Sequence, residues 1–131
     1  MSQKKTEIVR ALYEAMNDQD SGRVAELIHP EVEWVPDSRV GEGPIKGRES
    51  VIRFFMDRAE MFDEYHVEVE RLWEKDDQVL AFIRVRGSGQ GSGAQFDIRI
   101  GHLWIVHDEV GVRGEGYGDR GKALEAAGLS D

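Results

Sequence analysis

The stretch RVRGSGQGSGAQFDIRIGHLWIV, residues 84–106, decides the fold, because its glycine-rich middle admits two interpretations. Alternate glycines over residues 87–93 can cradle the phosphates of a nucleotide, provided that a strand precedes them and a helix follows. After them, however, Phe96, Ile98 and Ile100 alternate with polar residues, which is the pattern of a second strand. The strict G-x-G-x-x-G spacing is also missing. The run therefore predicts a flexible hairpin tip and no nucleotide site.

The same alternation continues on both sides of this hairpin. Residues 65–74 (YHVEVERLWE) and 78–86 (QVLAFIRVR) alternate between apolar and polar residues, and the charged residues between them indicate a turn. Residues 110–118 (VGVRGEGYG) follow as a last strand. These strands predict an antiparallel meander in which alternate residues share one face of the sheet.

Helices are predicted before and after this meander. Apolar residues at helical spacing over residues 8–16 indicate an amphipathic helix. The remaining segments are, in chain order, a short helix capped by Asp20 or Ser21, a short strand over residues 32–36, a helix from Arg48 to about Phe62, and a closing helix between Asp119 and Gly128. Helices followed by an antiparallel sheet and a closing helix predict the α+β class.

Composition and charge narrow the classes of protein. The 131 residues are enough for one domain, which we place over the whole chain, residues 1–131. The formal net charge is −9, and no stripe of Lys and Arg interleaved with aromatic residues offsets it, so nucleic acid is not an expected partner. The chain has no cysteine, no signal-peptide pattern and no apolar run long enough for a membrane span. We therefore expect a cytoplasmic protein with no membrane partner.

Metal and cofactor sites have no support in the sequence. The histidines are scattered: His29, His66, His102 and His107. His102 and His107 are an odd number of residues apart on one predicted strand, so they point to opposite faces. We expect neither a metal ion nor a cofactor.

Three stretches resemble one known family. LYEAMNDQDSGRVAELIHPEVEWV (12–35), GPIKGRESVIRFF (43–55) and GHLWIVHDEVGVRGEGYGDRGKALEAAGL (101–129) resemble the SnoaL-like branch of the nuclear transport factor 2-like superfamily. The resemblance implies a cone: a strongly curved antiparallel sheet wrapped around the N-terminal helices, with a pocket open at one end. It also implies a homodimer, and a functional range that includes polyketide cyclases, ketosteroid isomerases, limonene epoxide hydrolases and dehydratases.

The catalytic residues of two branches of this superfamily can be compared with the chain. The steroid isomerases have a tyrosine on the first helix, where this chain has Leu12 with Tyr13 beside it, and a base carboxylate after the first strand, near Asp37. Their protonated aspartate in the penultimate strand is replaced by Gly101. The Arg-x-Asp pair of the epoxide hydrolases is reversed here, at residues 97–99, on the expected convex face. The chain therefore departs from both sets.

Strand geometry provides a candidate site. If Asp108 and Glu109 form a two-residue turn, three pairs face each other on the pocket side: His102 with Glu115, Trp104 with Arg113, and Ile100 with Tyr117. A carboxylate beside His102 favours the imidazolium and fixes its tautomer, as general acid/base catalysis requires. If Gly111 carries the turn instead, the register slips and this pairing is lost. Two structural alternatives remain: His102 as a hydrogen-bonded core residue, and Trp104 with Arg113 as a cation–π contact.

Other residues are expected to complete the pocket. Trp34, Tyr13 and Phe55 supply apolar walls together with Trp104 and Tyr117, and Asp37 at the pocket mouth is the next candidate for the base. Apolar surface on Leu103, Ile105 and the strand of Val85 is expected to form the convex interface of the homodimer.

Two functions fit these residues. The first is a cofactor-independent enzyme that performs isomerase, cyclase or dehydratase chemistry on a small, apolar carbonyl or polyketide-like compound. The second is a non-catalytic dimeric protein that binds a small hydrophobic ligand. Two or more titratable groups that converge in the pocket favour the enzyme, whereas a lone histidine among aromatic residues favours binding.

Overall fold

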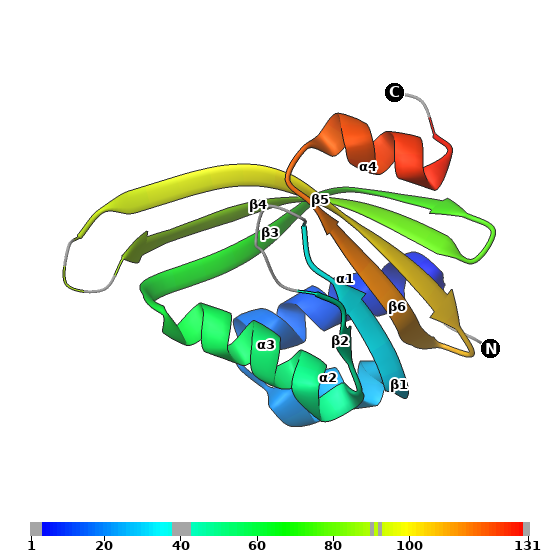
Figure 1. Cartoon of the computed structure of the whole chain (residues 1–131), viewed down its shortest axis with the longest axis horizontal. Helices are drawn as coiled ribbons and strands as arrows, with labels where there is room; N and C mark the ends of the chain where they lie inside the picture. The colour runs from blue at the N-terminus through cyan, green and yellow to red at the C-terminus, as the bar shows by residue number, and fades with distance from the viewer. Residues whose placement is uncertain (1–3, 38–42, 90, 92, 130–131) are drawn as a thin grey trace.

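The computed structural model describes residues 4–37, 43–89, 91 and 93–129, which form helices around one sheet (Figure 1). The helices are α1 (Lys5–Asn17), α2 (Ser21–Leu27), α3 (Arg48–Glu60) and α4 (Arg120–Ala127). The strands are β1 (Ile28–Val35), β2 (Ile45–Lys46), β3 (Phe62–Lys75), β4 (Gln78–Gly89), β5 (Gln95–His107) and β6 (Val110–Tyr117), in the order β2-β1-β6-β5-β4-β3. None of the helices described here has both the length and the apolar character needed to cross a membrane.

The glycine-rich stretch is a hairpin between β4 and β5. Val85 lies opposite Ile98 and Ile83 opposite Ile100, so the apolar residues of both strands share one face as predicted. The amide of Gly89 donates to the carbonyl of Ala94 at 2.8 Å, and no helix follows. The prediction of a hairpin is confirmed, although β4 continues through Gly89 and the tip is shorter than expected. Two residues assigned to the tip, 90 and 92, lie outside the described part.

The sheet is mixed, whereas the sequence predicted an antiparallel one. β3 to β6 form the antiparallel meander. β1 joins the free edge of β6 in parallel, with Trp34 opposite Gly114. It begins at Ile28 and is longer than predicted, since its first residues also pair with β6. This parallel pairing brings a first-strand tryptophan beside the last strand of the sheet.

Helices cover both faces of the curved sheet (Figure 1). α1, α2 and α3 lie on the concave side, and α1 buries Ile8, Leu12 and Tyr13 there, each at most 2% exposed. α4 lies on the opposite, convex side, over a small cluster that includes Leu80 and Leu103. The concave side is therefore enclosed by helices around a space, and the convex side is only partly covered.

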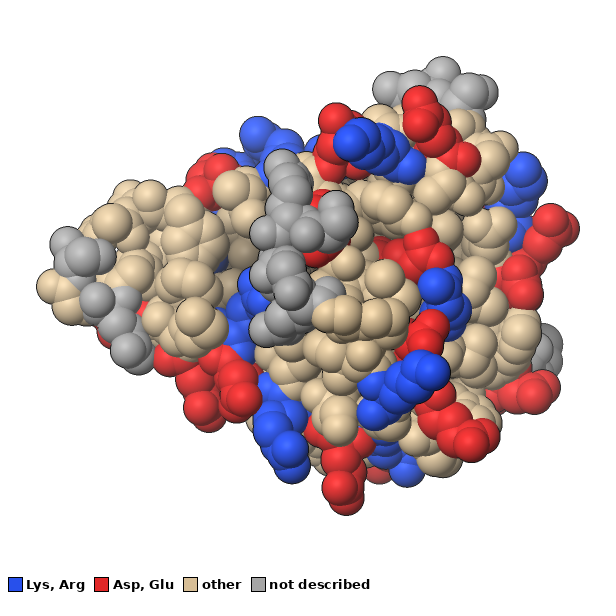
Figure 2. Space-filling view, viewed as in Figure 1, with Lys and Arg blue, Asp and Glu red and all other residues tan. Residues whose placement is uncertain are grey.

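Part of the apolar dimer surface expected from the sequence is taken up within the chain, although Ile105 is only half-buried. Leu103 is 6% exposed because it packs against α4, and Val85 is 3% exposed because it faces the concave core. Neither offers apolar surface to a partner, so that part of the expectation is wrong. On the face shown in Figure 2, acidic and basic side chains are interspersed, and the described residues there form no continuous basic stripe.

Candidate functional site

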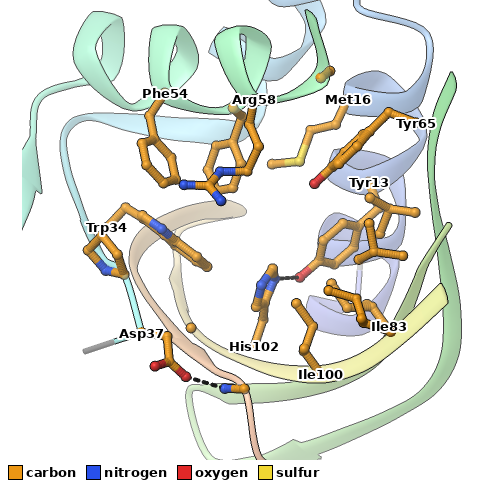
Figure 3. Close-up of a pocket in the computed structure, with 18 of the residues that line it drawn as sticks. Tyr13, Met16, Trp34, Asp37, Phe54, Arg58, Tyr65, Ile83, Ile100 and His102 are labelled. Atoms are coloured by element: carbon orange, nitrogen blue, oxygen red, sulfur yellow. Dashed lines mark hydrogen bonds between the residues drawn. The ribbon is translucent and has the colours of Figure 1, made fainter. Parts of the chain in front are cut away.

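A cavity of about 630 Å³ lies between the concave face of the sheet and the helices α1 and α3 (Figure 3). Its walls are largely aromatic: Trp34, Phe54, Phe55, Phe62, Tyr65 and Phe96. Polar side chains enter it at a few points only, among them His102 of β5, Asp37 after β1 and Arg58 of α3. Apolar walls with a few fixed polar groups are typical of sites for small organic molecules.

His102 lies on the concave face, where the sequence placed it. Its side chain is 8% exposed and its ring centroid lies 4.8 Å from that of Trp34, which is edge-on to it. Its hydrogen-bond partner is Tyr13 of α1, whose hydroxyl oxygen lies 2.6 Å from Nδ1. The alternation of β5 therefore orients the ring correctly, but the expected carboxylate is not its neighbour.

A chain of two hydrogen bonds fixes the tautomer of His102. Nε1 of Trp104 can only donate, and it donates to the hydroxyl oxygen of Tyr13 at 2.9 Å. The single hydrogen of that hydroxyl is then donated to Nδ1 of His102. Because Nδ1 accepts, the neutral ring carries its own hydrogen on Nε2. In the other tautomer the Tyr13 hydrogen has no acceptor among the described residues, and it is buried.

Burial keeps both rings of this chain uncharged. Desolvation by burial lowers the pKa of His102 from its usual 6.5 to about 3. Desolvation also raises the pKa of Tyr13 well above its usual range, so that its hydroxyl remains a donor. The expectation of an imidazolium is therefore wrong. The group is a neutral imidazole whose Nε2–H is a fixed hydrogen-bond donor.

Nε2–H of His102 faces the cavity near Asp37. Among the described residues no side chain pairs with this nitrogen, and no buried polar side-chain atom is unsatisfied, so Nε2 has access to the cavity. Gly116 of β6 lies between the two residues: a Cβ built on it is 3.9 Å from Cδ2 of His102 and 3.5 Å from the amide nitrogen of Asp37. Trp34 is closer still, with Cζ2 3.3 Å from that Cβ, so the missing side chain at Gly116 makes room for the indole ring.

Asp37 is at the edge of the cavity, as expected. It follows β1 by two residues, and its Oδ2 accepts a hydrogen bond from the amide of Gly118 at the end of β6 (Figure 3). The parallel pairing of β1 with β6 thus places a carboxylate at the same end of the sheet as His102. The carboxylate of Asp37 therefore borders the cavity.

Three predicted site residues lie on the wrong face for the predicted role. Glu115 lies opposite Leu103, Arg113 opposite Ile105, and Tyr117 opposite Gly101, all on the convex side. Glu115 accepts hydrogen bonds from Arg113 and Tyr117, and Arg113 also donates to Glu33 of β1 at 3.1 Å. Tyr117 borders the cavity but packs with the cluster beneath α4. No His102–Glu115 pair exists, and no Trp104–Arg113 contact forms.

A β-bulge at Val112 accounts for this error. Asp108 and Glu109 form the predicted two-residue turn with φ of 51° and 68°, and His107 lies opposite Val110 as predicted. The next pairs are Val106 with Gly111 and Ile105 with Arg113, which leave Val112 unopposed. One extra residue moves every later side chain of β6 to the other face of the sheet.

The bulge also turns two glycines of β6 toward the concave core. A Cβ on Gly114 lies only 2.6 Å from Trp34 and 2.8 Å from Trp104, so only glycine leaves room for both indole rings. Their ring centroids are 5.2 Å apart. Trp34 and Phe55 form the walls as predicted, with ring centroids 4.9 Å apart. Trp104 is fully buried behind them, where it supports Tyr13 and does not border the cavity.

The polar residues of the cavity that were not assigned roles from the sequence include Arg58 and Tyr65. Arg58 lies within the apolar side of α3, at residues 51–62, and Tyr65 begins the alternating pattern of β3. A charged residue inside an apolar helical stripe is the signal that identifies Arg58. Among the described residues, no group of three or more His, Asp and Glu side chains is arranged to hold a metal ion.

The comparisons with known proteins agree with this fold. A model of the SnoaL-like domain matches residues 9–115. No curated protein is similar enough in sequence to count as a relative. Wild-type IdmH of Streptomyces antibioticus, provisionally described as a polyketide cyclase, has 21% identity and a TM-score of 0.80 over 97% of this chain and 100% of its own.

Two further solved structures contain small molecules. TerC, co-crystallised with polyporic acid, has 22% identity and a TM-score of 0.78 over 92% of this chain and 95% of its own. A protein of Catenulispora acidiphila with a ketosteroid isomerase-like fold was solved in complex with trimethylamine. It has 19% identity and a TM-score of 0.77 over 95% of this chain and 94% of its own. At these identities the structures show a common fold. With the domain match over most of its length, the chain belongs to the SnoaL-like family.

Proposed function

We propose that this protein is a cofactor-independent enzyme that binds a small, largely apolar carbonyl compound and catalyses a proton transfer of the isomerase or cyclase type. The observation that carries the proposal is the chain from Trp104 through Tyr13 to His102, which fixes an Nε2–H donor in an apolar cavity. A donor held in place before reaction stabilises developing negative charge without reorganisation. Small molecules bound to proteins of the same fold support a ligand site.

In this proposal the carbonyl oxygen of the substrate accepts the hydrogen bond from Nε2 of His102. Asp37 removes a proton from the carbon next to the carbonyl, and the electron pair moves onto the oxygen as an enolate. Where a C=C adjoins the enolate, the resulting dienolate takes the proton back from Asp37 at the far carbon, which is an isomerisation. Otherwise the enolate carbon attacks a second carbonyl of the substrate, and the alkoxide formed there takes the proton from Asp37, which closes a ring. Since the pKa of His102 is about 3, its ring stays a neutral donor through both steps.

The volume and lining of the cavity indicate which class of substrate it can hold. A volume of about 630 Å³ lies within the ordinary range for small-molecule sites, and its aromatic walls favour flat or ring-bearing ligands. Polar groups at three separate points, His102, Asp37 and Arg58, exceed what apolar binding alone requires. The second candidate function, non-catalytic binding of a hydrophobic ligand, is favoured by the largely apolar lining alone.

Exchange of the α-hydrogens of 2-tetralone in D₂O, followed by NMR, tests the enzyme proposal. We expect the protein to accelerate exchange above buffer, and Asp37→Asn to remove most of the acceleration. His102→Leu, which removes the donor, should lower it roughly 100-fold, as loss of one oxyanion donor does elsewhere. His102→Gln should lower it less, because the amide still donates.

Asp97→Asn is the matched control for Asp37→Asn. It removes one carboxylate from the convex face, where Asp97 is paired with Arg84, and should leave exchange unchanged. Tight binding of 2-tetralone without any acceleration contradicts the enzyme proposal and favours the binding protein. Equal losses in His102→Gln and His102→Leu contradict the donor role of His102.

We also propose that the protein is a homodimer, as the family resemblance implies, and that it resides in the cytoplasm, whose reducing conditions fit a chain without cysteine. The available surface is the part of the convex face that α4 leaves uncovered, where Arg84 pairs with Asp97 and Arg86 with Glu68. A two-fold axis can exchange such pairs between two copies. Light scattering at micromolar concentration should give twice the mass of one chain, and the mass of a single chain contradicts the dimer.

A further inference from the structure

Arg58 is an isolated cation in the wall of the cavity. Among the lining residues that the structure describes, it is the one Lys or Arg side chain. Figure 3 shows its guanidinium extending from α3 into the cavity, while His102 stands on the sheet across from it. Its side chain is half-buried. The position on the inner side of α3 therefore directs a full positive charge at whatever the cavity holds.

No carboxylate of the described residues forms an ion pair with Arg58. Its guanidinium carbon lies 4.7 Å from the ring centroid of Phe54, a cation–π contact. Other arginines of the chain are bonded to carboxylates: Arg84 to Asp97 at 2.5 Å, and Arg120 to Glu70 at 2.5 Å. An aromatic face offsets only part of the cost of holding a cation against apolar walls. Arg58 is thus prepared for an anion that the described residues do not supply.

Tyr65 reinforces the positive character of this end of the cavity. Its side chain lines the same cavity, and in Figure 3 it points into the cavity with Met16 between it and the Arg58 guanidinium. Burial raises the pKa of Tyr65, and the Arg58 charge opposes this only in part, so the hydroxyl remains a neutral donor. The one carboxylate among the described lining residues, Asp37, lies after β1 at the other side of the view. An anion therefore meets attraction at Arg58 and repulsion at Asp37.

We infer that Arg58 binds an anionic oxygen group of the ligand, so that the substrate is an apolar, ring-bearing organic acid. This rests on the proposed function, in which the same cavity holds the substrate, and it defines how the substrate lies. The carboxylate, or an equally acidic enol oxygen, faces Arg58 and Tyr65. The apolar rings fill the aromatic walls, and the reacting carbonyl points to His102. A guanidinium can donate two hydrogen bonds to such a group.

Binding of two matched probes tests this inference. Anthraquinone-2-carboxylate and anthraquinone-2-carboxamide have the same ring system and nearly the same shape, and differ in charge. Equilibrium dialysis of each with the full chain gives two dissociation constants. We expect the carboxylate to bind about tenfold more tightly or better, as expected for a hydrogen bond to a charged group. Added salt should reduce this ratio, since the contact is partly exposed.

Variants of two arginines on α3 show whether the preference for the carboxylate probe comes from Arg58. Arg58→Met keeps the length of the side chain and should bring the ratio close to one, with little change for the carboxamide, and Arg58→Lys should restore part of the preference. Arg53 is exposed on the outer side of α3, so Arg53→Met removes the same charge from the chain without changing the cavity. It should leave the ratio unchanged. Circular dichroism checks that each variant is folded.

The outcomes separate this inference from the proposed function. Equal binding of both probes by the wild-type chain, or a preference that survives Arg58→Met, overturns the anion site while the cavity remains a ligand site. A preference lost equally in Arg53→Met also overturns it, because the effect is then general electrostatics. If the wild-type chain binds neither probe, the ring-bearing substrate class fails together with the anion site.

Discussion

The concave and convex faces of the same strands hold their polar groups in different ways. On the concave face Trp104, Tyr13 and His102 are buried and joined by hydrogen bonds, and none of them carries a charge. On the convex face the side chains of Arg84 and Asp97 pair as full charges with 27% and 43% of their surface exposed. An enclosed charge is costly, whereas water screens an exposed pair. Only the concave face can therefore keep a donor in one fixed direction.

The concave and convex faces should also differ in how well they tolerate amino-acid substitutions. Where the indole rings of Trp34 and Trp104 pack over Gly114, the concave side has no spare volume. The convex face is covered by α4 at one part and by long charged side chains elsewhere. Substitutions on the two faces should therefore differ in size and in cause.

The largest effect is expected for Gly114→Ala. The added methyl group lies 2.6 Å from Trp34 and 2.8 Å from Trp104, and neither indole ring can move without disturbing the core. We expect a loss of about 3 kcal/mol in the free energy of unfolding, measured by urea denaturation, the upper end for an overpacked core.

Gly111→Ala is the matched control on the same strand. A methyl group there meets Trp104 at 3.4 Å, which is close to ordinary contact, so stability should change little or increase slightly. If both alanine variants are equally stable, the packing of the two indole rings against β6 is not as described.

A smaller effect is expected from pH. His102 has a pKa of about 3 in the folded chain and about 6.5 when unfolded, so below pH 6.5 the unfolded state binds the extra proton. The contribution of His102 to the free energy of unfolding is fully present above pH 6.5 and is lost progressively as the pH falls toward 3. Between pH 7 and pH 5 the loss should be about 2 kcal/mol, obtained by linkage as the difference between wild type and His102→Gln. Identical pH dependence of the two proteins would mean that His102 is already charged, or exposed, in the folded state.

The smallest effect is expected on the convex face. Arg84→Gln removes one partner of an exposed pair with Asp97, in which Nε donates to Oδ1 at 2.8 Å. Because water solvates both groups in either state, the urea midpoint should hardly move. A shift comparable with that of Gly114→Ala would show that the convex charges stabilise the fold as much as the concave core does.

The features that could be predicted from the sequence are those that depend on local periodicity. Alternation placed the β4–β5 hairpin and put His102 on the concave face, and the residues 108–109 form the predicted turn. The bulge at Val112 has no such signal, because one unopposed residue leaves the alternation of β6 intact. The sequence therefore predicted the strand β6, but not the face of the sheet on which Arg113 and Glu115 lie.

The hydrogen-bond partner of His102 was missed for a different reason. Tyr13 was identified as a wall residue from its place on an apolar helix face, but its hydroxyl meets β5 only through tertiary packing 89 residues away. Asp37 was placed correctly at the cavity from the family resemblance, in which a base carboxylate follows the first strand. Arg58 could have been noticed as a charge within an apolar stripe, yet the stripe alone does not show what the charge faces.

The protonation state of the His102 ring tests the central claim most directly. Long-range ¹H–¹⁵N NMR of the imidazole distinguishes a bare nitrogen from a protonated one. We predict a bare Nδ1 and a protonated Nε2 for His102, unchanged from pH 7 to pH 5, and a mixture of tautomers in Tyr13→Phe, where the fixed donor is lost. A His102 ring that titrates to the imidazolium near its ordinary pKa of 6.5, or that carries its hydrogen on Nδ1, contradicts the account.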